Sequence, residues 1–108
     1  KNIQFKNLGV DFSDEQIEIF TQINYHHYEK NIKFLLDVKL ILEKLVEANN
    51  SNKLYESELF ANYIQKLWFN VCTNSSSLGY EVFKLYKSSF LSMNNLTIKL
   101  FMKTLLKK

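Results

Sequence analysis

Residues 32–45 read IKFLLDVKLILEKL, and their apolar positions decide the fold class. Val38, Leu42 and Leu45 recur at three- and four-residue spacing, which places their side chains on one face of an α-helix. A second apolar row lies off that face and consists of Ile32, Leu36 and Leu40. A helix with two apolar sides is either wrapped by neighbouring helices or leaves one side exposed as a groove or patch. Both interpretations stay open, and in the first of them this segment is the central helix.

The helical pattern extends upstream without an obvious stop from Ser13 to Asn49. A single helix over this range would be about 54 Å long. A compact chain of this length has a radius of gyration of only about 13 Å. We therefore expect the first helix to be long and either kinked or split near residues 24–30.

The start of this helix carries specific local signals. Ser13 and Gln16 stand at the spacing of a capping box, in which each side chain satisfies the other's backbone N–H. Asp14 and Glu15 follow in the first turn, where the helix dipole favours negative charge. Residues 1–12 before the cap alternate in polarity and predict a short extended arm that lies on the helices.

Further amphipathic segments follow downstream, separated by Asn/Ser-rich turns at residues 49–52, 74–77 and 94–95. Segment 53–72 repeats apolar residues at Phe60, Tyr63, Ile64, Leu67, Trp68 and Val71. The next segment carries Leu78, Val82, Leu85, Tyr86 and Met93 on one face, and residues 96–106 form the last. The chain is thus predicted to be an all-α four-helix bundle and a single domain over residues 1–108. Because it opens at Lys1, we expect it to be a fragment of a longer protein.

Some apolar residues face away from the core stripes of their own helices. Phe69 lies opposite the stripe of segment 53–72, and Tyr80 and Leu91 do the same in the next helix. These residues are either covered by the N-terminal arm or exposed for a partner. The predicted interaction surface consists of Phe69, Tyr80, Leu91, Ile32, Leu36 and Leu40.

No constellation of residues points to catalysis, a metal or a cofactor. His26 and His27 are helix neighbours, whose side chains diverge by about 100° and do not chelate together. Cys72 stands at the edge of an apolar stripe and is expected to be a buried, inert thiol. Glu43 and Glu47, one turn apart, are typical of a solvated face. We expect a protein that is not an enzyme, with no catalytic, cofactor-binding or metal-binding residues.

The charge composition bears on the partner. All 14 basic residues are lysine, and the net charge is only +3 and spread along the chain. Because specific DNA readout relies on arginine and clustered charge, we expect no direct specific DNA binding. Lys99, Lys103 and Lys107 form a stripe on the last helix, so a peripheral membrane or cytoskeletal binder is the alternative. A protein or peptide partner is favoured over a membrane.

The order of segments resembles a known family. A leucine-rich helix (FLLDVK, residues 34–39) and an aromatic amphipathic helix precede LYKSSF at residues 85–90. An asparagine–leucine break at residues 94–96 and a last apolar helix follow. Over residues 20–106 this resembles the ACDC domain, found mainly near the C-terminus of apicomplexan plant-like (Apetala-type) transcription factors. The resemblance implies a four-helix bundle in a nuclear transcription regulator, with DNA contacted by a separate domain and no catalytic residues.

Residues 58–90 also look like the helical bundle at the N-terminus of the elongation factor TFIIS and the integrase-binding domain of LEDGF. That second resemblance implies an interaction module that binds short linear peptides.

Overall fold

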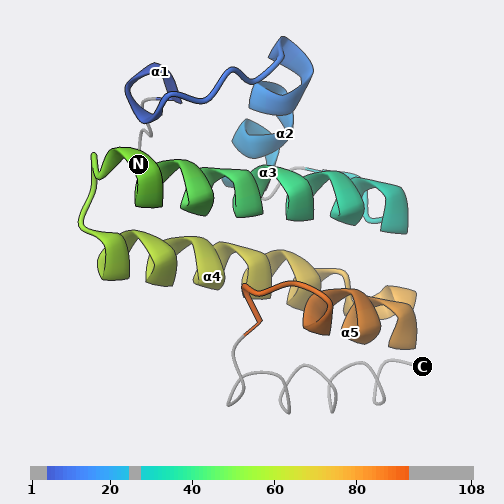
Figure 1. Cartoon of the computed structure of the whole chain (residues 1–108). Helices are drawn as coiled ribbons and strands as arrows, with labels where there is room; N and C mark the ends of the chain where they lie inside the picture. The colour runs from blue at the N-terminus through green and yellow to red at the C-terminus, as the bar shows by residue number, and fades with distance from the viewer. Residues whose placement is uncertain (1–4, 25–27, 93–108) are drawn as a thin grey trace.

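The computed structural model describes residues 5–24 and 28–92 of the 108-residue chain, and these residues form helices and turns only (Figure 1). The elements are α1 (Phe5–Leu8), α2 (Asp14–Asn24), α3 (Ile32–Asn52), α4 (Ser57–Asn74), the 3-10 helix η1 (Ser76–Leu78) and α5 (Tyr80–Lys87). The Cα radius of gyration is 13.8 Å. The all-helical, compact fold predicted from the sequence is confirmed, and it is bundle-like. Met93 and the predicted helix over residues 96–106 lie outside the described residues.

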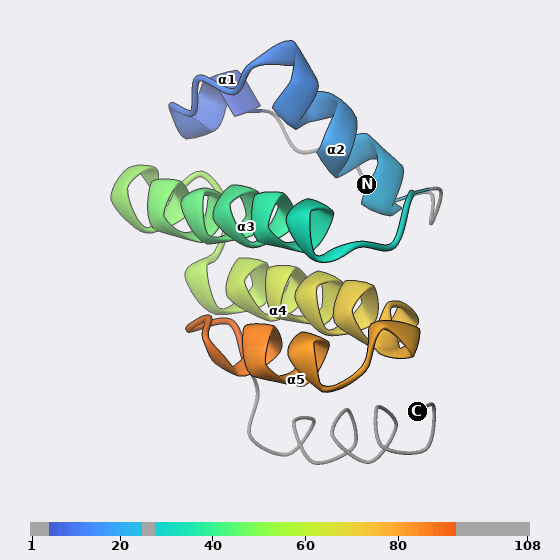
Figure 2. The ribbon, with the colours of Figure 1, turned by 90° about the vertical axis from the view of Figure 1, so that its right-hand side faces the viewer.

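The helices stack around the central pair α3 and α4 (Figures 1 and 2). These two run side by side and antiparallel, joined by a short turn. α1 and α2 lie against α3 on one side of this pair, while α5 packs against α4 on the other. α3 is therefore the central helix, as its apolar pattern predicts, and its contacts reach α1, α2, α4 and α5.

The stretch from Ser13 to Asn49 contains two helices rather than one. α2 ends at Asn24, residues 28–31 are not helical, and α3 begins at Ile32. Asn31 caps α3, because its backbone is extended and its Oδ1 accepts a 2.7 Å hydrogen bond from the Phe34 N–H. The predicted capping box at the start of α2 is also confirmed. The Ser13 N–H donates to Gln16 Oε1 (2.9 Å), and the Gln16 N–H donates to Ser13 Oγ (3.1 Å).

The extended arm predicted over residues 1–12 is wrong at residues 5–8, which form the short helix α1. Gly9 ends α1 with a φ of 77°, and the Asn52 side chain donates a hydrogen bond to the Leu8 carbonyl. Leu8 is fully buried, and the Phe5 ring packs edge-on against Phe20 at 5.5 Å. A contact with a residue 44 positions away thus holds α1 in place, which a local polarity pattern does not reveal.

The predicted turn at residues 49–52 is also displaced, because α3 continues through Asn52. The chain turns instead after Lys53, which adopts a left-handed backbone with φ 57°. Asn49 is buried and organises this turn with both halves of its amide. Its Nδ2 donates to the Tyr55 carbonyl (3.1 Å), and its Oδ1 accepts from the Tyr55 N–H (2.8 Å).

The core is one cluster of buried apolar residues that runs from α1 and α2 across α3 and α4 to α5. The predicted core residues Leu42, Leu45, Ile64 and Val82 are fully buried. Leu67, predicted at the centre of its stripe, is only partly buried. Its neighbour Trp68 takes the central place, stacking on Tyr86 with ring centres 6.2 Å apart and donating from Nε1 to the Tyr86 carbonyl. Trp68 is therefore the central residue of α4, because the buried face of α5 packs against the edge of α4 that carries Trp68.

Candidate interaction surface

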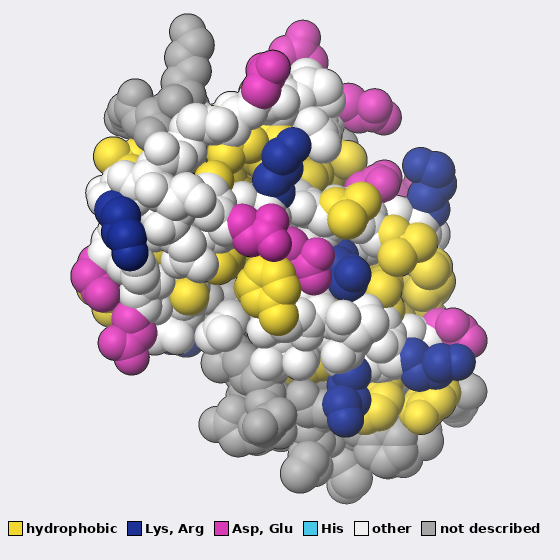
Figure 3. Space-filling model, in the orientation of Figure 1, with side chains coloured by type: hydrophobic (Ala, Val, Ile, Leu, Met, Phe, Trp, Pro, Cys, Tyr) yellow, Lys and Arg dark blue, Asp and Glu magenta, His cyan; other side chains and the backbone are white. Residues whose placement is uncertain are grey.

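The outer row of α3 is the clearest exposed apolar feature among the predicted residues. Ile32, Leu36 and Leu40 succeed one another at four-residue spacing on α3. Leu36 is 45% exposed and Leu40 is 61% exposed, whereas Ile32 is partly buried against the core. Figure 3 shows hydrophobic side chains over this helix with acidic and basic side chains beside them. The second apolar side of α3 is thus exposed over Leu36 and Leu40 and is not wrapped there.

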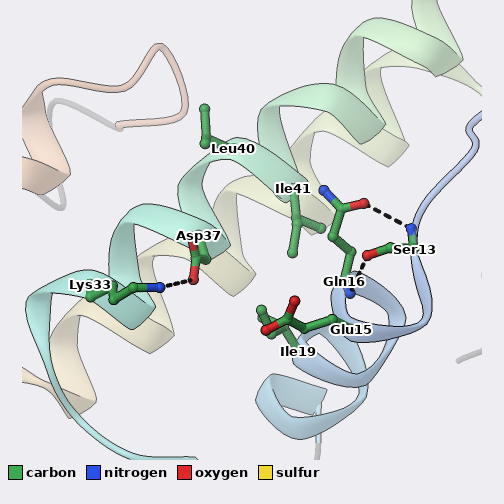
Figure 4. Close-up of a pocket in the computed structure, with 8 residues that line it drawn as sticks. All are labelled: Ser13, Glu15, Gln16, Ile19, Lys33, Asp37, Leu40 and Ile41. Carbon is green, nitrogen blue, oxygen red and sulfur yellow. Dashed lines mark hydrogen bonds and ion pairs between the residues drawn. The ribbon is translucent and has the colours of Figure 1, made fainter.

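A groove runs between α2 and α3 beside this row. A hollow of about 420 Å³ is lined by Ser13, Glu15, Gln16 and Ile19 from the α2 side and by Lys33, Asp37, Leu40 and Ile41 from α3 (Figure 4). A second hollow of about 320 Å³ shares Glu15, Ile19, Lys33 and Asp37 and adds Glu18, Gln22, Asn31 and Phe34. Because the two hollows share four residues, we treat them as one surface, the α2–α3 groove.

Local sequence signals position both ends of the α2–α3 groove. The capping box of Ser13 and Gln16 fixes the start of α2 at one end, as Figure 4 shows. Asn31, which caps α3, lines the opposite end near Gln22. The two helices are antiparallel along the groove, so the start of α2 lies beside Leu40 and Ile41. A helix cap therefore defines the residue at which each wall begins.

The groove has an apolar floor and an acidic rim. Ile41 is buried, Ile19 is partly buried, and Leu40 forms an exposed edge on α3. Of the charged residues lining the groove, Glu15, Glu18 and Asp37 are carboxylates, and only Lys33 is basic. This local excess of negative charge contrasts with the net charge of +3 for the whole chain.

The ion pair on this rim, which lies within α3, is weak. Lys33 Nζ lies 3.6 Å from Asp37 Oδ2, and both side chains are well exposed. Exposed pairs at this helical spacing contribute about 0.3–0.5 kcal/mol, because water screens the charges. Lys33 can therefore swing away from Asp37 at little cost, leaving three carboxylates for an incoming cation.

The other predicted interaction residues do not share a surface with this groove. Leu91 is only 1% exposed and belongs to the core, so its prediction as a surface residue is wrong. Phe69 is partly buried and packs edge-on against Tyr86, with ring centres 6.0 Å apart. Tyr80 is 43% exposed and contacts the Phe83 ring. The predicted exposed patch of Phe69, Tyr80 and Leu91 therefore does not form.

The rival prediction, that the N-terminal arm covers that patch, is not met by residues 5–12; Ile3 lies outside the described residues. The described part of this segment, α1, packs on α3 and on Phe20 of α2, on the opposite side of the central pair from α5 (Figure 2). Leu91 is instead held by its own turn, where its N–H donates to Ser89 Oγ at 3.1 Å. The packing of α5 and its following turn, rather than the arm, accounts for this burial.

Sequence reasoning missed the α2–α3 groove and the surroundings of Glu43. Glu43 was predicted on a solvated face, yet its side chain is largely buried, lies 3.7 Å from Lys39 Nζ and accepts a hydrogen bond from Ser89. The groove and the surroundings of Glu43 both depend on which helices pack against each other. The only sequence signals for the groove were the acidic first turn of α2 and the apolar row on α3.

The described part of the chain was expected to hold neither a metal site nor a reactive thiol. No group of three or more His, Cys, Asp or Glu side chains there is arranged to hold a metal ion. Cys72 is buried, as predicted, and burial raises the pKa of its thiol, which keeps it protonated. His26 and His27 lie outside the described residues, as does the lysine stripe of Lys99, Lys103 and Lys107.

No family model, curated protein or solved structure matches this chain. In the part of the chain that the structure describes, none of the helices has both the length and the apolar character needed to cross a membrane.

Proposed function

We propose that this chain is a non-catalytic protein-interaction domain and that it binds its partner along the α2–α3 groove and the adjoining Leu36 and Leu40. The observation that carries the proposal is that two leucines on the central helix stay exposed beside a hollow between two helices with capped starts. Exposed apolar residues next to a rimmed groove are typical of protein-binding surfaces. A domain that recognises a partner without reactive groups needs such a surface.

We further propose that the domain belongs to a nuclear DNA-binding transcription regulator in which a separate domain contacts DNA. The support is the resemblance of residues 20–106 to the ACDC domain of apicomplexan transcription factors. The absence of arginine and the low net charge support the assignment of DNA contact to another domain. A gel shift of the 108-residue chain at physiological salt is expected to show no sequence-dependent, nanomolar DNA binding.

The test of the interaction surface compares a double leucine replacement on α3 with a single leucine replacement on α4. One variant carries Leu36→Ser and Leu40→Ser, and the control carries Leu59→Ser on α4, a leucine that is 69% exposed. Each protein is immobilised and used to capture partners from an extract of the source cells, followed by quantitative mass spectrometry. Proteins retained by the wild type and the Leu59 variant should be lost from the double variant. Equal capture by all three proteins, with equal melting temperatures, would refute the proposed surface.

A further inference from the structure

The α2–α3 groove is the length of a short peptide segment. It extends along α2 from Ser13 to Gln22 and along α3 from Asn31 to Ile41. At a rise of about 1.5 Å per residue, either wall is about 14–15 Å long. That length fits about four or five extended residues, at about 3.3 Å each, or about ten residues of helix. A short linear segment of another protein fits a groove of this length.

The charged residues on the two walls determine whether the bound segment is acidic or basic. Glu15 and Glu18 project from α2, and Asp37 projects from the facing α3. An acidic segment, a nucleic acid or an anionic lipid headgroup would face carboxylates on both sides. Lysine or arginine side chains would instead meet a carboxylate on either wall and would release Lys33 from its weak pair with Asp37.

The apolar residues supply an anchor point for the same segment. Leu40 stands at the edge of the hollow and is 61% exposed, while Ile19 and the buried Ile41 line its inner part. A leucine or aromatic side chain inserted here would remove Leu40 from water. Burial of such an anchor carries much of the energy of peptide recognition, and the charges around it give specificity and speed of association.

We infer that the α2–α3 groove binds a short linear segment of another protein that carries two or more lysines or arginines next to one leucine or aromatic residue. The inference rests on the proposed function and specifies the chemistry of its partner. It follows from the charge of the groove, which is opposite in sign to that of the chain as a whole.

The test begins with a phage-displayed library of random 12-residue peptides selected on the 108-residue chain. Peptides that bind should be enriched in Lys and Arg beside Leu, Phe or Trp. The best of them, labelled with fluorescein, is then titrated by fluorescence anisotropy against the wild-type chain and its variants. Its Kd should rise with NaCl concentration, because salt screens the groove carboxylates.

Matched variants locate the binding site of the selected peptide. Glu15→Gln with Glu18→Gln should weaken binding by about two- to thirtyfold, which corresponds to two exposed charge pairs. Glu58→Gln with Glu81→Gln, on α4 and α5, changes the net charge equally and should leave the Kd unchanged. Leu40→Ser should weaken binding by about fivefold or more, and Leu59→Ser should not. Replacing both glutamates by lysine should restore binding of a peptide whose basic residues are replaced by glutamate.

The outcomes separate this inference from the proposed function. Selected peptides that need Leu36 and Leu40 but lack basic residues, or that bind equally to the Glu15/Glu18 variant and its control, would overturn the basic-segment inference alone. Selected peptides whose binding is unaffected by any change in the groove or at Leu36 and Leu40 would overturn both. Failure of the library to yield any binding peptide would also count against both.

Discussion

The Ser89 hydroxyl donates a 2.7 Å hydrogen bond to the Glu43 carboxylate, joining the turn after α5 to the middle of α3, 46 residues earlier. Ser89 is buried, and its oxygen also accepts from the Leu91 N–H. Lys39 lies 3.7 Å from the same carboxylate and offsets its charge. This chain of contacts holds Leu91 in the core and fixes the turn after α5 against the middle of α3.

Replacing Glu43 by alanine should therefore lower the free energy of unfolding by about 1–3 kcal/mol, because it leaves the buried Ser89 hydroxyl without its acceptor. Glu47→Ala, one turn later on the exposed side of α3, should change it by less than about 0.5 kcal/mol. Glu43→Gln keeps an acceptor and should fall between them. Urea unfolding followed by circular dichroism measures all three. Equal stability of the Glu43 and Glu47 alanine variants would show that the contact is not stabilising.

The adjacent residues Asn49 and Asn50 offer a second matched pair. Asn49 is buried and satisfies both backbone groups of Tyr55, whereas Asn50 is exposed. Asn49→Ala should cost about 2–4 kcal/mol, since two backbone groups lose their partners, and Asn50→Ala should cost almost nothing. Amide hydrogen exchange of Tyr55 should also become faster in the Asn49 variant only. Unchanged exchange at Tyr55 would contradict the role given to Asn49 in the turn between α3 and α4.

The features that could be predicted from the sequence are those that depend on near neighbours. The capping box of Ser13 and Gln16 joins residues three apart, and the central helix follows from the spacing of Val38, Leu42 and Leu45. Such signals need no knowledge of how helices meet. The helical character of the chain and most of its core therefore followed from local spacing.

The features that could not be predicted depend on contacts between distant segments. Leu36 and Leu40 are exposed because α2 and α4 cover other faces of α3, and only the packed arrangement decides which face stays open. Leu91 is buried through its turn and Ser89, and the acidic α2–α3 groove arises from the pairing of two helices. An apolar residue off its helix stripe indicates either coverage or a surface, and spacing alone does not distinguish them.

Leu45 and Leu67 together test which faces of α3 and α4 point into the core. Leu45 is fully buried on α3, whereas Leu67 is partly buried at the edge of α4. Leu45→Ala should cost about 2–5 kcal/mol, the usual range for a leucine deleted from a packed core. Leu67→Ala should cost clearly less, because its site opens to solvent and leaves little cavity. Thermal melts of the two variants compare them directly, and an equal or larger loss for Leu67 would mean that α4 is rotated relative to this structure.

The buried thiol of Cys72 should show both slow labelling and a defined pH response. Burial raises its pKa in the folded state above the ordinary value of 9.0, so the folded protein holds this proton more tightly than the unfolded chain does. Below pH 9 both states are protonated, and the thiol makes no pH-dependent contribution. Above pH 9 the unfolded chain loses the proton first, so the free energy of unfolding should fall as pH rises.

Iodoacetamide at pH 8 should label the native protein far more slowly than the protein in 6 M guanidinium chloride, at about the rate of global unfolding. Labelling of the native protein as fast as that of the denatured chain would show that packing around α4 does not bury Cys72.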